Sequence, residues 1–179
     1  MNYQDILDFW FATENQKNWF NQSDAFDQSI ETQFKTTLLS ASKAELWHWR
    51  TTPEGRLAEI IVLDQFSRNL YRDSPLAFAQ DAQALVLAQQ AISLGLDQPL
   101  TAEQRAFLYM PFMHSESPLI HQHALKLFET LNNPINLDFE KRHKVIIDRF
   151  GRYPHRNQIL GRCSTAEETA FLMQPNSSF

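Results

Sequence analysis

Glycine and cysteine are scarce in this chain, and it has neither long apolar runs nor stretches of strictly alternating polar and apolar residues. Each of the four glycines (Gly55, Gly95, Gly151 and Gly161) stands near an expected helix end, where helical proteins use glycine. The lone Cys163 cannot form an internal disulfide. No stretch approaches the roughly 20 apolar residues of a membrane span, and no basic N-terminal segment leads into one. We therefore expect an all-α protein that is cytoplasmic and binds no membrane.

The composition is that of one compact, acidic domain. Of the 179 residues, 43% are hydrophobic and 12% aromatic, so the chain can bury one sizeable core, and we expect a single helical domain over residues 1–179. The net charge of −5 argues against general nucleic-acid binding. A small anionic partner is still compatible with this composition, because the positive charge is concentrated locally.

Repeated helix-start signals indicate the helical fold. Three Ser/Thr–Pro pairs are typical of an N-cap followed by proline at the first helical position, and two threonines have capping-box spacing to Gln or Glu. These are Thr52-Pro53, Ser74-Pro75, Ser117-Pro118, Thr101 with Gln104, and Thr165 with Glu168. The patterns predict helices over 3–12, 24–41, 43–50, 53–72, 76–94, 102–110, 118–132, 137–150, 154–160 and 165–173. Short turns would join them as antiparallel hairpins, without a self-similar repeat of roughly 34 residues.

Positive charge is concentrated in residues 141–162, KRHKVIIDRFGRYPHRNQILGR. This segment holds seven of the sixteen Lys and Arg residues and one acid, so it carries +6 while the remainder carries −11. Arginine binds carboxylate or phosphate through a planar fork of donors. Arg149, Arg152 and Arg156 cluster around Gly151 and Pro154, which we expect to end one helix and start another. The backbone N–H groups of residues 155–157 would then add donors, and the segment predicts an anion site.

The expected helix over residues 53–72 carries a second polar group. At about 100° per residue, Asp64 and Arg68 fall on one face among apolar residues, and the opposite face is apolar too. This helix should therefore be central, with Asp64 and Arg68 paired across four residues. Two interpretations stay open: a structural ion pair that fixes packing, or a pocket in which Asp64 orients Arg68 toward a ligand.

A third group follows Pro111, which we expect to interrupt a helix. His114, Ser115 and Glu116 would then lie at an element end, where a histidine and a nearby carboxylate can act as a general base and its partner. They could equally cap the neighbouring helices. His143 lies on an apolar helix face, where it could move a proton or serve simply as a hydrogen-bonded core histidine.

Motifs for metals and cofactors are missing from the sequence. His114, Glu116, His121 and His123 are the candidate metal ligands, but His121 and His123 diverge on a helix and no HExxH is present. No glycine-rich phosphate loop or nucleotide fingerprint occurs. We therefore expect neither a metal nor a cofactor.

Four motifs together resemble a bacterial family called domain of unknown function 924. They are DILDFWF near the start, LDQFSRNLYR in the central helix, YMPFMHSE, and H-x5-RFGRYPHRN-x2-LGR-x-ST-x-EE over residues 143–168. The resemblance spans nearly the whole chain and implies an all-α, tetratricopeptide-like superhelical domain, with no established activity. The matching motif positions are Asp64, Gln65, Phe66, Arg68, Asn69, His114, Glu116, His143, Arg149, Phe150, Gly151, Arg152, Pro154, Arg156, Asn157, Gly161, Arg162, Ser164 and Thr165.

Two classes of function fit these residues, beside a purely structural arginine network. In the first, a polar pocket binds a small anionic molecule, and acid–base chemistry could make the protein an enzyme. The candidate catalytic residues are His114, Glu116, His143 and Asp64, and the candidate ligand-binding residues are Arg68, Asn69, Arg149, Arg152, Arg156, Asn157 and Arg162. In the second, the helices form an interaction module for an acidic peptide. We favour the pocket, because His together with Asp, Glu and Arg suits proton transfer at an anion.

Overall fold

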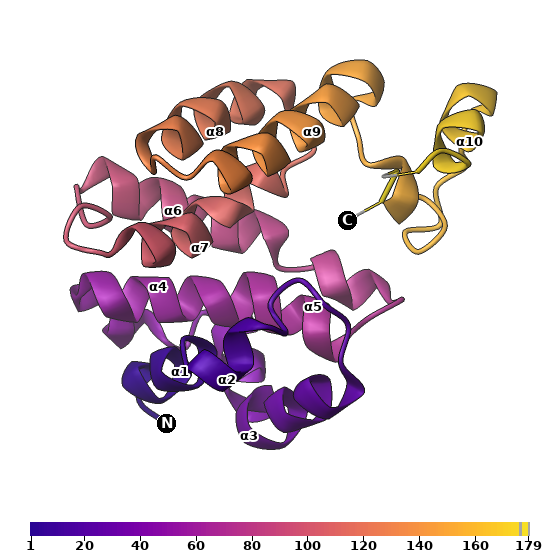
Figure 1. Ribbon diagram of the computed structural model, residues 1–179. Helices are drawn as coiled ribbons and strands as arrows, with labels where there is room; N and C mark the ends of the chain where they lie inside the picture. The colour runs from indigo at the N-terminus through magenta and orange to yellow at the C-terminus, as the bar shows by residue number, and fades with distance from the viewer. Residues whose placement is uncertain (176, 179) are drawn as a thin grey trace. The chain divides into compact units, whose positions relative to one another are not determined.

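The computed structural model describes residues 1–175, 177 and 178, and these residues form helices, turns and loops without any strand. The predicted all-α fold is therefore confirmed (Figure 1). The chain folds as two compact units. Unit 1 comprises Met1–Arg72 and Leu76–Pro111, and unit 2 comprises Asp73–Pro75 and Phe112–Phe179. The single-domain organisation and the tetratricopeptide-like superhelix stay predictions.

Unit 1 is built around the segment that follows Pro53. Its elements are α1 (Tyr3–Trp10), α2 (Thr13–Gln16), α3 (Asp24–Ser42), η1 (Trp47–Thr51), α4 (Pro53–Ile61), η2 (Val62–Phe66), α5 (Ser67–Leu70), most of η3 (Pro75–Phe78), α6 (Asp81–Ser93) and most of α7 (Ala102–Met113). Helices α1 and α6 pack on α4, and α3 packs on η2 and α5. Residues 57–66 are all buried, so the helix that the sequence predicted to be central is central to this unit.

Aromatic side chains fill the core beside that helix. The rings of Trp10, Phe26, Phe34, Phe66 and Phe107 are all buried, and neighbouring centroids in this group lie 5.3–6.0 Å apart. Burial of one such ring contributes several kcal/mol, because truncating a core Phe or Trp to Ala costs about 3–5 kcal/mol. This packing accounts for the aromatic-rich N-terminal third of the sequence.

Unit 2 contains a helical hairpin followed by the motif-bearing loop. Helices α8 (Pro118–Thr130) and α9 (Pro134–Phe150) lie side by side (Figure 1), and the turn η4 (Pro154–Arg156) and helix α10 (Ala166–Leu172) follow. Because only residues 131–133 separate α8 from α9, the two helices run antiparallel. Within the described residues of both units, no helix is long and apolar enough to cross a membrane.

The predicted helix starts are confirmed where a side chain caps a helix. Thr52, Ser117 and Thr165 accept backbone N–H bonds at the starts of α4, α8 and α10, and Thr101 and Gln104 bond each other's backbone N–H groups. A further cap was missed: Asn133 accepts from the N–H groups of residues 135 and 136 ahead of Pro134. Local capping side chains therefore set the starts of these helices.

Several boundaries differ from the prediction. Helix α7 continues through Pro111 to Met113, so the expected interruption is wrong. A proline there removes only one bond near the helix end, which the remaining turn tolerates. The ranges 43–50 and 154–160 contain only the short 3-10 turns η1 and η4. The range 76–94 divides into η3 and α6, because no side chain caps α6 and it starts only at Asp81.

Two glycines show different reasons for the residue. Gly151 ends α9 with φ of 67°, the left-handed conformation expected of a helix C-cap. Gly55 instead lies in the first turn of α4, where a Cβ would come within 2.0 Å of the Trp49 carbonyl oxygen. Glycine at position 55 thus lets η1 pack directly on the start of α4.

Candidate functional site

The polar group of unit 1 is built on a π-helical turn. Residues Val62–Phe66 form this turn, η2, in the middle of the central helix, and Asp64 and Gln65 within it are buried. Single π turns inside α-helices occur often at functional sites. Asp64 Oδ2 accepts a 2.6 Å bond from Gln65 Nε2. The sequence predicted a helix here but gave no signal for the π turn.

Arg68 links this turn to α6. Its Nη1 lies 3.0 Å from Asp64 Oδ1 and donates to the Asp64 carbonyl oxygen at 2.8 Å. The same nitrogen lies 2.9 Å from Asp81 Oδ1, so the predicted Asp64–Arg68 pair is present within a network of three charges. Asn69 donates to Asp27 of α3 at 2.7 Å. These bonds tie α3 and α6 to the central helix, as expected of the structural interpretation.

Tyr153 is the centre of the polar group in unit 2. The side chain is fully buried, and its O–H donates to the Met113 carbonyl oxygen at 2.5 Å. Its backbone N–H donates to Glu116 Oε1 at 2.7 Å. The guanidinium of Arg156 lies over the ring, 4.5 Å from the centroid. We call the residues in contact with this tyrosine the Tyr153 cluster: Met113, Glu116, His121, His143, His155, Arg156 and Arg162.

Glu116 and Arg162 form a two-bond ion pair within the cluster. Arg162 Nη1 and Nη2 lie 2.5 and 2.9 Å from the two Glu116 carboxylate oxygens. Arg162 Nε donates to Asn157 Oδ1 at 3.0 Å, so the buried Asn157 orients the guanidinium. Burial raises the pKa of Glu116, but the bonds from Arg162 and the Tyr153 N–H and the charges of Arg162 and Arg156 outweigh it and hold the pKa below its ordinary value.

His143 is held neutral inside unit 2. Its Nδ1 lies 2.8 Å from the Phe139 carbonyl oxygen, so this nitrogen carries the proton and Nε2 is the acceptor in the neutral ring. Burial lowers the pKa of His143 to about 3, and the charges of His114, His121 and Arg156 contribute in the same direction. Its helix face is buried, as expected for either a core histidine or a base.

A buried pair joins α8 to α9 and was missed as such by the sequence reasoning. His121 Nδ1 lies 2.8 Å from Glu140 Oε1, and His121 Nε2 lies 2.9 Å from the Ser115 carbonyl oxygen. Both side chains are fully buried, and Glu140 Oε2 has no hydrogen-bond partner among the described residues. Burial raises the pKa of Glu140 even though its bond to His121 opposes the shift. The sequence did carry one signal for the burial of Glu140. It lies three residues before His143, so its carboxylate falls on the same buried face of α9.

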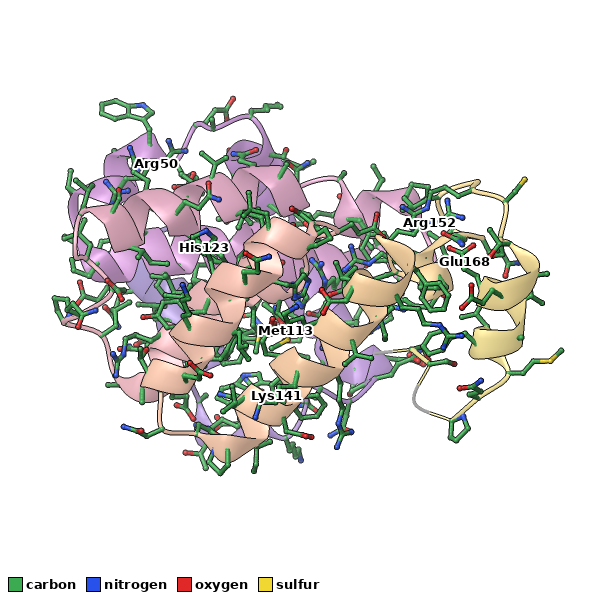
Figure 2. The ribbon with its side chains drawn as sticks, turned by 90° about the horizontal axis from the view of Figure 1, so that it is seen from above. Arg50, Met113, His123, Lys141, Arg152 and Glu168 are labelled. Atoms are coloured by element: carbon green, nitrogen blue, oxygen red, sulfur yellow. The ribbon has the colours of Figure 1, made fainter. Side chains whose placement is uncertain are left out.

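The arginines nearest α10 are held by its acidic first turn. Arg152 bonds Glu168 through Nε and Nη2 at 2.6 and 2.8 Å, and the two side chains point toward one another in Figure 2. The bond from Arg152 lowers the pKa of Glu168 to about 2. Arg149 pairs with the exposed Glu167 at 2.8 Å. The basic segment is therefore largely neutralised by carboxylates of its own chain.

The backbone donors expected at residues 155–157 are already used in part. The N–H groups of Arg156 and Asn157 donate to the carbonyl oxygens of Tyr153 and Pro154 at 3.1 and 3.0 Å. The prediction of free donors is therefore wrong for Arg156 and Asn157, because η4 is a single 3-10 turn whose bonds run between residues three apart.

The Tyr153 cluster contains four of the predicted site residues, Glu116, His143, Arg156 and Arg162. Asp64, Arg68 and Asn69 belong to unit 1, and the other predicted site residues belong to unit 2. A surface pocket of about 340 Å³ in unit 1 is lined by other side chains, namely Gln4, Leu7, Asp8, Phe11, Ala12, Glu54 and Gln104. Across the described residues there is no group of three His, Cys, Asp or Glu side chains that could hold a metal ion.

Comparison with known proteins agrees with this description. The family model described as bacterial protein of unknown function (DUF924) matches residues 6–176. The chain belongs to this family. A solved structure, described as a protein of unknown function from Agrobacterium tumefaciens, is 37% identical and superposes with a TM-score of 0.91 over 96% of each chain. No curated protein matches the chain. The DUF924 match includes the π turn and the Tyr153 cluster, so both polar groups lie in the region that defines the family.

Proposed function

We propose that this DUF924 protein binds a small anionic ligand at the Tyr153 cluster of unit 2 and exchanges a proton with it. The observation that carries the proposal is the placement of two arginines around Tyr153. The guanidinium of the buried Arg156 lies over the ring, Arg162 donates to the Tyr153 carbonyl oxygen, and His143 is kept neutral with a pKa of about 3. Guanidinium groups in a partly buried place favour the binding of an anion.

The Glu116–Arg162 pair indicates how such a ligand would bind. Both side chains are 25% exposed, so the pair lies where a solute can reach it. Glu116 already presents a carboxylate to Arg162 in the two-bond geometry that arginine offers to carboxylates and phosphates. A ligand anion would exchange with Glu116 at this guanidinium. The released Glu116 would then take a proton from the ligand, or the acceptor nitrogen of His143 would do so once the negative charge of the ligand has raised its pKa.

The outer arginines supply further binding groups in this proposal. Arg152 uses Nε and Nη2 for Glu168 and the Cys163 carbonyl oxygen, and its Nη1 makes no hydrogen bond to the described residues. The Arg152 side chain is 29% exposed, so this nitrogen can bond a second oxygen of a dicarboxylate or phosphate. Arg149, Asn157 and His114 would orient or extend the site rather than contact the reacting atoms.

Thermal unfolding with added anions tests the binding. Phosphate or succinate should raise the melting temperature more than chloride at equal ionic strength, and at a hundred times the Kd the gain corresponds to about 2.7 kcal/mol. Arg156→Ala with Arg162→Ala should reduce the response. Arg142→Ala is the matched control, since this exposed arginine of α9 pairs with Asp138 and lies outside the Tyr153 cluster. An equal response in both variants would exclude the Tyr153 cluster.

Calorimetry tests the proton exchange separately. Binding measured in two buffers of different ionisation enthalpy reports protons taken up or released. Uptake that is lost in Glu116→Gln or His143→Gln would support acid–base chemistry. Binding without proton exchange would indicate that the protein binds the anion but does not carry out acid–base chemistry on it.

A second candidate is the interaction module, and the outer face of α9 favours it. Ile135 and Val145 are 66% and 65% exposed, and the Arg142 guanidinium lies 5.7 Å from the Phe139 ring on the same face. An acidic peptide with apolar side chains would fit these residues. Ile135→Ser with Val145→Ser should then abolish peptide binding while leaving the phosphate response of the Tyr153 cluster unchanged.

A further inference from the structure

Two arginines in unit 1 lie near one carboxylate, but only one of them bonds it. Arg50 of η1, labelled in Figure 2, bonds both oxygens of the fully buried Glu59 at 2.7 Å. Arg56 lies one helical turn before Glu59 on α4, so the two side chains are neighbours on one helix face. Glu59 is therefore fully engaged by Arg50, and the three groups together carry one excess positive charge.

Arg56 lacks an anionic partner although it is buried. The residue is 8% exposed, and its single hydrogen bond to the described residues runs from Nη1 to Gln90 Oε1 at 2.9 Å. Its Nε is buried without any acceptor in the described part of the chain. Burial lowers the pKa of Arg56, and the charge of Arg50 adds to this effect more than Glu59 offsets it. A buried guanidinium bonded only to a neutral amide is costly unless a counterion is nearby.

Gln90 directs further donors toward solvent at this point. Its Oε1 faces Arg56, so its Nε2 carries two N–H groups on the other side of the amide, and the residue is exposed on α6. Arg56 keeps 8% exposure beside the exposed Gln90, so its guanidinium lies just beneath the surface of unit 1. A guanidinium in this place can bond an oxyanion that approaches beside Gln90.

We propose that Arg56 and Gln90 form a binding site for a small oxyanion, a carboxylate or phosphate group, on unit 1. The ligand supplies the negative charge that Glu59 cannot give to Arg56. This site shares no residue with the Tyr153 cluster and does not depend on the function proposed there.

Phosphate titration of the full-length protein, followed by amide and arginine side-chain NMR, tests the site. Saturable shifts are expected at the Gln90 side-chain amide and the Arg56 Nε–H. They should persist in Arg156→Ala with Arg162→Ala, which separates this site from the Tyr153 cluster. The Lys43→Met control, which removes an exposed charge from the same unit, should keep them too. Shifts that are absent, or that do not saturate, would overturn the proposal.

Two variants make the test independent of whether one substitution disturbs the fold. Arg56→Met removes the uncompensated charge and should raise the melting temperature in the absence of phosphate while losing the titration at Gln90. Gln90→Glu supplies an internal carboxylate, so it should also raise the melting temperature and eliminate the phosphate shift at the Arg56 Nε–H. A lower melting temperature in both variants, or an unchanged titration in either, would show that Arg56 does not bind an anion.

Discussion

The polar groups of the two units are assembled in different ways. In unit 1, Asp64 and Arg68 are four residues apart on one helix, and their bonds form as soon as that helix does. In unit 2, Glu116 receives its bonds from Tyr153 and Arg162, which lie 37 and 46 residues further along the chain. A pair within a helix needs little loop closure, whereas a pair across a long segment forms only when the tertiary structure is complete. The Asp64–Arg68 pair is therefore local, whereas the contacts of Glu116 depend on the tertiary structure of unit 2.

The sharpest test of this difference is Asp64→Ala. Removing the buried Asp64 carboxylate leaves Arg68 with Asp81 as its remaining partner in this network. We therefore expect a loss of about 3 kcal/mol in the free energy of unfolding. Urea unfolding measures it. Asp138→Ala is the control, because that carboxylate also lies four residues from its arginine but is 55% exposed. It should cost only about 0.5 kcal/mol. Equal losses would mean that burial does not distinguish the two pairs.

The second test breaks the long-range contact with Glu116→Gln. The substitution keeps the shape but removes the charge that Arg162 and the Tyr153 N–H share, so a loss of about 2 kcal/mol is expected. Glu167→Gln, at an exposed partner of Arg149, should change stability by about 0.5 kcal/mol or less. If phosphate no longer stabilises Glu116→Gln, then the carboxylate takes part in ligand binding instead of only competing for Arg162.

The third test uses pH. The pKa of His143 is about 3 in the folded protein and near 6.5 when unfolded, so the unfolded state binds the proton first as the pH falls. Stability from this residue is present above about pH 6.5, and about 2 kcal/mol of it should be lost by about pH 5. The free energy of unfolding of the wild type and of His143→Gln, each measured at about pH 6.5 and at about pH 5, isolates the effect. An imidazole signal that titrates near pH 6.5 in the folded protein would contradict it.

The smallest effect is expected for Glu140→Gln. The pKa of Glu140 is raised by burial, so its contribution to stability is present at low pH and is lost as the pH rises through its folded pKa. A glutamine can keep one bond to His121 without titrating. We expect the variant to lie within about 1 kcal/mol of wild type at pH 5 and to gain stability relative to it at pH 8. A relative loss at pH 8 would show that the ionised carboxylate is the stabilising form.

These differences explain which features could be predicted from the sequence. Capping residues such as Thr52 and Thr165 act within four residues, and so does the pair of Asp64 with Arg68, and all of these were predicted and are present. The π turn was not predictable, because a single wide turn depends on the packing around it rather than on composition.

The partners in unit 2 depend on tertiary structure in the same way. Residue types and charge located the basic segment, but they did not show that Glu116, Glu167 and Glu168 would neutralise so much of it. The pairing of His121 with Glu140 follows from the contact of α8 with α9, which brings together residues nineteen apart. Sequence reasoning thus identified most of the polar residues of the site and missed most of their partners.

The π turn also determines how the central helix tolerates changes of length. A π turn closes its bonds over five residues in place of four, so it accommodates one residue more than an α-helical turn does. Loss of one residue from Val62–Phe66 would restore regular α-helix and leave the following residues, including Arg68 and Asn69, facing α6 and α3 as before. Loss of one residue elsewhere in the helix would rotate everything after it by about 100°. The turn is therefore the one point in this helix where an ancestral insertion or a later deletion could occur without turning its polar face.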